Sequence, residues 1–455
     1  TVSEEEYEKQ GENIWIAKTA KVAKSASITG PAIIGKEAEV RHCAFIRGNA
    51  IVGEGAVVGN STELKNVILF NKVQVPHYNY VGDSILGYKS HMGAASITSN
   101  VKSDKKLVIV KTPEGEIETG LKKFGAMLGD EVEVGCGSVL NPGTVVGSHT
   151  NIYPLSSVRG FVPAKRIGFI GVGIMGKSMV RNLKKAGFDL HIYARTKAKV
   201  EDVIAEGVTF HDSIADCVKD CEAVITIVGF PQDVEEVYFD QGNILDSAKE
   251  GAYLIDMTTT SPQIAQKIYE EGNKRGFHVL DAPVTGGDTG AKAGTLSILV
   301  GGDKEDFEAC MPLFEAMGTN INYQGAAGCG QHCKLANQIM IAGALSGVCE
   351  ALAYAQAKGL DLQTVLHSVS TGAAGSRQLD LFGPKILEGD YRPGFFMKHF
   401  IKDMKLALIE SNISGLDLNV LSQVLAEYEE LQAEGLGDEG TQALFKLYTQ
   451  EKADE

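Results

Sequence analysis

Three glycines spaced as GxGxxG form the clearest chemical motif in the chain. Gly171, Gly173 and Gly176 follow the apolar run KRIGFI and open a segment predicted to be helical, which includes Ile174 and Met175. In a strand–turn–helix of this kind, the glycines permit the tight turn, let a diphosphate approach the backbone, and let the helix pack on the strand. Because amides at the helix start bind anions, the motif predicts a dinucleotide site.

The end of the next predicted strand, DLHIY, indicates which dinucleotide binds. An NAD site usually places an acidic residue here for the ribose hydroxyls, whereas this chain has Ala194, Arg195 and Thr196. A carboxylate would repel a 2′-phosphate, while the planar guanidinium of Arg195 can bind one. The alternative is a solvated turn, and we favour NADP over NAD.

Two further loops are expected at the same site. The apolar strands AVITIVG and AYLIDMT follow, with helical segments between them, as a parallel doubly wound sheet requires. Loops after such strands lie at the carboxyl edge, where the cofactor binds. Gly229, Phe230 and Thr259 are therefore candidate cofactor contacts.

A lysine occupies an unusual place. Lys334 lies near the start of a long apolar helix predicted over 331–358, with Asn337 and Gln338 one turn further along. Its charge opposes the helix dipole there, which favours a functional reason over a surface one. If desolvated beside a cofactor, such an amine has a lowered pKa and could exchange a proton with a substrate oxygen.

A glycine-rich turn could hold an anionic group. In DAPVTGGDTGAKAGTLSILVGG, Gly286 and Gly287 expose backbone amides and Thr285 adds a hydroxyl donor. These groups suit a carboxylate. By itself, a turn of this composition between strands would more often be only a turn.

Together these segments resemble the β-hydroxyacid dehydrogenase family, from Lys165 to the end of the chain. That family includes 3-hydroxyisobutyrate dehydrogenase, tartronate semialdehyde reductase and glyoxylate/succinic semialdehyde reductase. The resemblance implies a small β-hydroxy acid substrate, interconverted with its aldehyde or keto acid. Related imine reductases usually lack the lysine, so Lys334 argues against that alternative.

The same resemblance implies roles for individual residues. Lys334 would be the acid/base catalyst, and either Asn337 or Gln338 would orient the substrate. In FFMKHFIKDMKLAL, Lys402 matches a lysine that reaches the cofactor. The substrate carboxylate would be held by Thr285, Gly286 and Gly287.

A six-residue period dominates the first third of the chain. Large aliphatic residues recur at Ile16, Val22, Ile28, Ile34, Val40, Ile46, Val52, Val58 and Leu64, continue at Phe70, and resume at Leu128, Val134, Leu140, Val146, Ile152 and Val158. Small residues stand two positions earlier, at Ala20, Ala26, Ala32, Ala38, Ala44, Ala50, Ala56 and Thr62. The period predicts a β-helix with three six-residue sides and inward aliphatic residues. The segment 99–123 interrupts it and is predicted to be an extruded loop with a short hairpin.

This repeat resembles the left-handed β-helix of hexapeptide acyltransferases, and most closely the acetyltransferase half of N-acetylglucosamine-1-phosphate uridyltransferases, over residues 12–164. The resemblance implies a catalytic histidine at His77, substrate contacts at Tyr80 and Asn100, and a trimer. However, the uridyltransferase half is missing and the loop after Asn100 departs from the family sequence. We therefore favour a scaffold, with sugar-nucleotide acyl transfer through His77 as the alternative.

The sequence thus predicts three domains: a left-handed parallel β-helix (1–164), an α/β Rossmann domain (165–325) and an all-helical substrate and dimerisation domain (326–455). No Gly/Ser-rich linker separates the first two. A direct fusion of two otherwise complete proteins, natural or engineered, is therefore a hypothesis. The wide apolar stripe of the long helix predicts a subunit contact.

Composition excludes several classes of function. The net charge of −15 argues against nucleic acid and anionic membranes as partners. No apolar run approaches the length of a membrane span, and we expect a cytoplasmic protein. Among the eight cysteines, Cys329 and Cys333 flank His332, but a fourth ligand is missing, so we predict no metal site.

Overall fold

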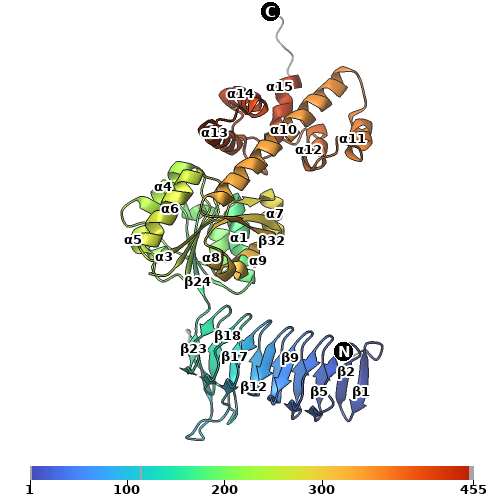
Figure 1. Cartoon of the computed structure of the whole chain (residues 1–455), viewed down its shortest axis with the longest axis vertical. Coiled ribbons are helices and arrows are strands. Elements are labelled where there is room, and N and C mark those ends of the chain that lie inside the picture. The colour runs from blue at the N-terminus through green and yellow to red at the C-terminus, as the bar shows by residue number, and fades with distance from the viewer. Residues whose placement is uncertain (1–2, 113–114, 450–455) are drawn as a thin grey trace, which may run out of the picture. The chain divides into compact units, whose positions relative to one another are not determined.

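The computed structural model describes residues 3–112 and 115–449 (Figure 1). The chain divides into two compact units. One contains Thr1–Arg166 with Lys184–Asp189, and the other contains Ile167–Leu183 with Leu190–Glu455. The predicted Rossmann and helical domains together make up the second unit.

Short parallel strands stack in the N-terminal unit (Figure 1), each paired with the strand 17 or 18 residues further along. Ile33 is in register with Ile51, for example, and Ile51 with Ile68. The strands form three faces, and β10 and β12 bend from face 3 into face 1. Face 1 contains β2 (Ile14–Ala17), β5 (Ala32–Ile34), β8 (Ala50–Val52), β10 (Glu63–Leu69), β12 (Tyr80–Leu86), β17 (Ala126–Leu128), β20 (Thr144–Val146) and β23 (Phe161–Val162), with β1 (Tyr7–Gly11) antiparallel to β2.

The other two faces are built from shorter strands. Face 2 contains β3 (Lys21–Val22), β6 (Glu39–Val40), β9 (Val57–Asn60), β11 (Gln74–His77), β13 (His91–Met92), β18 (Glu133–Val134) and β21 (Asn151–Ile152). Face 3 adds β4 (Ser27–Ile28), β7 (Phe45–Ile46), β14 (Ile97–Thr98), β19 (Val139–Leu140) and β22 (Ser157–Val158). The three faces enclose one continuous apolar core. The predicted coil is therefore present, and its left-handed sense stays a prediction.

The period-six prediction fails at one point. Phe70 was expected to face inward, but it is 51% exposed, and Leu69 fills the core position instead. The cause is a coil of 17 rather than 18 residues, since Leu69 is in register with Val52. The interruption at 99–123 carries the expected hairpin, formed by β15 (Ile109–Thr112) and β16 (Gly115–Glu118).

A nine-stranded sheet forms the centre of the second unit. Its order is β26-β25-β24-β27-β28-β29-β31-β30, with β32 beside β31. The strands are β24 (Arg166–Ile170), β25 (Asp189–Tyr193), β26 (Thr209–Phe210), β27 (Ala223–Thr226), β28 (Tyr253–Asp256), β29 (His278–Asp281), β30 (Val284–Thr285), β31 (Leu296–Gly302) and β32 (Gly318–Gly325).

The expectation of a wholly parallel sheet is only partly correct. The pairings of β24 with β27, β27 with β28 and β28 with β29 are parallel. β31, however, is antiparallel to both β29 and β30. The connection between β30 and β31 is shorter than the dozen or more residues that a parallel crossover needs, so this edge folds back on itself.

Helices cover both faces of the sheet (Figure 1). One layer consists of α3 (Ile214–Val218), α4 (Pro231–Phe239), α5 (Ile244–Ser247) and α6 (Pro262–Lys274). Their apolar side chains share a buried cluster with the strands. The remaining helices of this part are α1 (Ile174–Lys185), α2 (Glu201–Ala205), α7 (Gly287–Ala293), α8 (Lys304–Ala309) and α9 (Met311–Met317).

After β32 the chain is helical around one long central helix. This is α10 (Cys329–Ala357), which packs against α11 (Leu362–Ser370), α12 (Arg377–Leu387), α13 (Met397–Ile413), α14 (Asn419–Ala433) and α15 (Phe445–Thr449). By length and composition α10 could cross a membrane, contrary to the expectation from the sequence. Leu345, Cys349 and Leu352 nevertheless lie in the core of the helical bundle, and the central helix of a packed domain passes the same test.

Candidate active site

The glycine-rich turn after β24 has the geometry that a diphosphate requires. Gly171 adopts φ +97°, and a Cβ there would lie 2.1 Å from the carbonyl oxygen of Ile227. A Cβ at Gly176 would lie 2.2 Å from the carbonyl oxygen of Gly171, which explains the close packing of α1. Gly173, by contrast, faces open space on the side where a ligand would approach. The turn therefore fits a dinucleotide.

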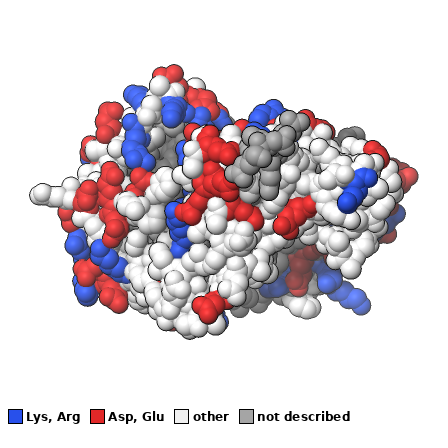
Figure 2. Space-filling view, turned by 90° about the horizontal axis from the view of Figure 1, so that it is seen from above, with Lys and Arg blue, Asp and Glu red and all other residues white. Residues whose placement is uncertain are grey.

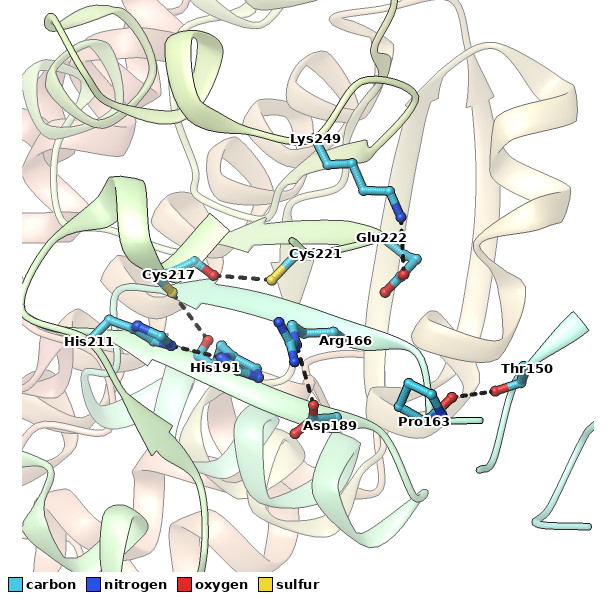
Figure 3. A network of polar contacts seen from close by, with 10 residues as sticks. All are labelled: Thr150, Pro163, Arg166, Asp189, His191, His211, Cys217, Cys221, Glu222 and Lys249. Atoms are coloured by element: carbon cyan, nitrogen blue, oxygen red, sulfur yellow. Dashed lines mark hydrogen bonds and ion pairs between the residues drawn. The ribbon is translucent and has the colours of Figure 1, made fainter. Parts of the chain in front are cut away.

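The strand that carries the 2′-phosphate candidates is anchored by a polar network (Figure 3). His191 on β25 forms a 2.7 Å hydrogen bond between its Nδ1 and His211 Nε2, and the Cys217 thiol donates to the backbone carbonyl of His191. Ala194, Arg195 and Thr196 follow this strand directly. An anchored strand end fixes where these residues begin, which a specific phosphate site needs.

Lys334 lies one turn into α10 and is 7% exposed. Burial lowers the pKa of its amine to about 8; Asp403 opposes this shift and Lys402 adds to it. The amine is therefore close to the protonation balance that proton transfer near neutral pH needs.

Lys334 is accompanied by a buried polar chain between the two halves of the second unit. Gln338 donates from Nε2 to Asp403 Oδ2 at 2.7 Å, and Asn337 donates to Gln338 Oε1 at 2.8 Å. Asp403 Oδ1 lies 2.8 Å from Lys402 Nζ. Lys402 in turn donates to the carbonyl oxygen of Thr259, in the loop after β28. Sequence-predicted residues from α10, α13 and the sheet edge are thus brought together.

The start of α10 is fixed to the sheet by two residues that sequence reasoning missed. Asp281, at the end of β29, accepts from the amides of Gly328 at 2.8 Å and Gln331 at 2.9 Å. The Gln331 side chain is fully buried; it accepts from Thr260 N at 3.0 Å and donates to the Thr258 carbonyl at 2.8 Å. These bonds position Lys334 one turn later.

The predicted carboxylate-binding turn lies at the antiparallel edge. Thr285 ends β30, and Gly286 and Gly287, with φ of +128° and +63°, lead into α7. A Cβ at Gly394, just before α13, would lie 3.2 Å from Asp288 Oδ1, so the start of α7 faces this segment. No hydrogen bond among the described residues joins this turn to the Lys334 chain.

His399 and Asp233 also border the candidate site and were missed. Asp233 accepts from Phe230 N at 2.9 Å, and the His399 ring lies 5.0 Å from the ring of Phe230. Burial lowers the pKa of His399, and Lys402 adds to the effect. An acid three residues after a loop was the available signal for Asp233, because it forms a helix-capping box. Nothing in the sequence pattern marked His399.

The solenoid residues predicted for acyl transfer are only partly assembled. Asn100 Nδ2 donates to the Tyr80 hydroxyl at 3.1 Å and to Asp83 Oδ2. The same Asp83 accepts from Asn66 at 2.7 Å, so Asn100 continues a polar ladder between coils. His77 is exposed, and its ring has no hydrogen bond to the described residues. Within 3–112 and 115–449, no cluster of three His, Cys, Asp or Glu side chains is placed to hold a metal.

Comparisons with known proteins agree with this geometry. A family model described as the NAD binding domain of 6-phosphogluconate dehydrogenase matches residues 166–325, and one described as the NAD-binding of NADP-dependent 3-hydroxyisobutyrate dehydrogenase matches residues 328–448. A Bacillus subtilis protein named uncharacterized oxidoreductase YkwC is 51% identical over 284 residues, which is 62% of this chain and 99% of that protein.

Two further relatives decide the family. An Arabidopsis thaliana protein named probable 3-hydroxyisobutyrate dehydrogenase-like 1 is 43% identical, covering 62% of this chain and 84% of the relative. This chain belongs to the 3-hydroxyisobutyrate dehydrogenase-like family. A solved structure of Mycobacterium tuberculosis 3-hydroxyisobutyrate dehydrogenase with L-serine has a TM-score of 0.58 and 27% identity, covering 63% of this chain and 99% of that one. The second unit is thus an NAD(P)-dependent dehydrogenase of this family.

The N-terminal unit matches a different family model. A model described as the GMPPB C-terminal domain matches residues 28–154. This match covers the core of the stacked strands and excludes the dehydrogenase part. The two parts of the chain therefore have separate sets of relatives.

Proposed function

We propose that the protein is an NADP-preferring reductase and dehydrogenase that interconverts a small β-hydroxy acid with its aldehyde or keto acid. The observation that carries the proposal is the buried amine of Lys334, whose pKa is lowered to about 8 beside Asp403 and Lys402. The family shown above supports the reaction class. The mycobacterial 3-hydroxyisobutyrate dehydrogenase was solved with L-serine, which supports a hydroxy acid as the substrate type.

The nicotinamide group, when bound, accepts or supplies the hydride. The task of Lys334 is to move the proton at its Nζ. In oxidation, the neutral amine takes the proton from the substrate hydroxyl as the carbonyl forms; in reduction, the ammonium donates it to the carbonyl oxygen. Asp403 keeps a share of Lys334 protonated by raising its pKa. Gln338 holds Asp403 in place, with Asn337 behind it.

Cofactor preference is assigned to the loop after β25. Arg195 would hold the 2′-phosphate with Thr196 and the backbone of Ala194, because no carboxylate stands at this strand end. The other proposed cofactor contacts are Gly171, Gly173, Ile174, Met175, Gly176, Gly229, Phe230, Thr259 and Lys402.

The substrate carboxylate is assigned to the turn after β30. The backbone amides of Gly286 and Gly287 and the hydroxyl of Thr285 are donors suited to an anionic oxygen. Positive φ values at both glycines support this assignment, because they allow successive amides to point to one side.

A substrate panel tests the function. Hydroxy acids of two to five carbons are assayed with NADP and NAD on the full chain, on Lys334→Ala and on Lys304→Ala, an exposed lysine of α8 that serves as control. We expect at least one acid to be turned over, with NADP preferred. Lys334→Ala should lower kcat by about a thousandfold while cofactor binding persists. Near-normal turnover by Lys334→Ala would refute the role of the amine.

For the N-terminal unit we propose a left-handed β-helix that serves as a scaffold. The exposed ring of His77 and the use of Asn100 in the polar ladder favour a scaffold over acyl transfer. Incubation with acyl-CoA donors and sugar nucleotides tests this. Turnover that disappears in His77→Ala would overturn it.

We also propose that copies of the chain associate through both units. On face 1 an outward ladder is wholly apolar and in register, which supports a trimer of β-helices: Trp15, Ile33, Ile51, Ile68, Ile85, Met127, Val145 and Phe161. In the helical domain Met340, Ile409, Ile413 and Val420 are more than half exposed, which supports a dimer. Eight free thiols support a cytoplasmic location. Light scattering and fractionation test these proposals.

A further inference from the structure

One carboxylate links the two loops that are assigned to the cofactor. Asp233 lies in the first turn of α4, just after Gly229 and Phe230, and its side chain is 16% exposed. Its Oδ2 accepts from Phe230 N at 2.9 Å, and its Oδ1 lies 3.0 Å from Arg195 Nη2. The loop after β27 is thereby tied to the loop after β25.

The carboxylate cannot easily move away from this place. A Cβ at position 229 would lie 3.1 Å from Asp233 Oδ2 and 3.5 Å from His399 Cε1, so the space on that side is already filled. The bond to Phe230 N also closes a capping box at the start of α4. Negative charge is therefore fixed beside the guanidinium of Arg195.

The ion pair itself contributes little to stability. The Arg195 side chain is 68% exposed, and exposed pairs are weakened by solvent. Its effect on a charged ligand is larger, because a cofactor 2′-phosphate brings nearly two negative charges to the same guanidinium. NAD has a hydroxyl at that position and meets no such competition.

We propose that Asp233 determines cofactor discrimination by competing with the 2′-phosphate of NADP for Arg195. The carboxylate holds the preference for NADP over NAD below what Arg195 alone would give. This inference rests on the proposed binding of the 2′-phosphate at Arg195. Asp233 acts through Arg195 and is a specificity-determining residue of the cofactor site.

The test measures Kd of NADPH and NADH on the full chain for wild type and Asp233→Asn. Asparagine keeps the size and can still accept from Phe230 N through its oxygen. Asp361→Asn is the matched control, because Asp361 also caps a helix through a backbone amide, at Thr364 N. We expect Asp233→Asn to bind NADPH about five- to tenfold more tightly and NADH within about twofold. The gain should shrink between 0.05 and 0.5 M salt, because screening weakens charge effects.

A second pair of variants separates charge from shape. Asp233→Glu keeps the charge and should keep the wild-type ratio of the two Kd values, whereas Asp233→Gln should shift the ratio toward NADPH. An unchanged ratio in both neutral variants, or weaker NADPH binding, would overturn the inference. The proposed NADP preference fails separately, if wild type binds NADH more tightly and Arg195→Ala changes neither Kd.

Discussion

Lys334 shows how burial makes an ordinary side chain reactive. A surface lysine is almost wholly charged at neutral pH, and desolvation alone lowers the pKa of this one toward the working range. The nearby charges act in opposite directions: Asp403 raises the pKa and Lys402 lowers it. The set point therefore depends on both helices, α10 and α13.

Replacing Asp403 by Asn should shift the pH profile of the enzyme to lower pH. Wild-type oxidation should rise as pH passes about 8, because the neutral amine is the base, and reduction should fall over the same interval. Without the carboxylate the pKa of Lys334 drops, so both midpoints should move down by roughly one unit. The measurement is kcat/KM in both directions from pH 6 to 10.

Asp438→Asn is the control for this experiment. Asp438 also pairs with a lysine of α13, Lys398, at an exposed position. Its removal should leave both midpoints in place. A midpoint that stays fixed or rises in Asp403→Asn would show that the carboxylate does not set the pKa of Lys334.

At the level of elements, α10 is positioned from its first turn. Its N-terminal amides are satisfied by Asp281, and its third residue, Gln331, reaches back to the loop that carries Thr259. Since Lys402 donates to the carbonyl of Thr259, helix, loop and α13 move together or not at all.

Gln331→Leu should loosen this assembly. Two buried backbone groups, Thr260 N and the Thr258 carbonyl, would lose their partner, and each costs about 1–3 kcal/mol when left unpaired. Hydrogen exchange at the start of α10 and at residues 258–260 should accelerate, and kcat/KM should fall at least tenfold. Gln356→Leu, at an exposed position of the same helix, should change neither. Unaltered exchange in Gln331→Leu would contradict the role assigned to this side chain.

The sequence predicted elements whose signal is local. The GxGxxG turn, the long helix and the six-residue coil all follow from spacing along the chain, and each is present. Phe70 was misplaced because a coil shortened by one residue keeps the same composition and changes only the register.

Site residues that depend on tertiary contacts could not be predicted in this way. Asp281 stands in the DAPV motif with no role that the sequence could assign, and Asp233 and His399 carry no local signal of a site. Their partners lie 47, 38 and about 170 residues away in the sequence, at Gly328, Arg195 and Phe230 respectively. No periodicity connects positions so far apart.

At the scale of the whole molecule, charge is distributed without a dominant basic region on the face shown in Figure 2. Basic side chains there stand in small groups among acidic ones, with wide uncharged areas between them. The net charge of −15 would add long-range repulsion toward polyanions. Association through apolar surfaces is therefore more plausible physically than association with nucleic acid.

A chain of residues 165–455 should fold and act alone. The Bacillus relative is matched over 99% of its length by this part, so a complete dehydrogenase needs nothing more. We expect kcat/KM within about threefold of the full chain and a particle mass that falls to a dimer, because the trimer contact is assigned to face 1. Light scattering and steady-state kinetics measure both. Aggregation, or a loss above tenfold, would show that the dehydrogenase depends on the N-terminal unit.

The stacking of coils also has a mechanical consequence. Each coil forms hydrogen bonds only to the coils before and after it, as in the run from Ile33 to Ile51 to Ile68. Tension applied at the N-terminal end would peel the solenoid away one rung at a time. Each rung of 17 or 18 residues should release roughly 60 Å of slack, giving an evenly spaced force trace.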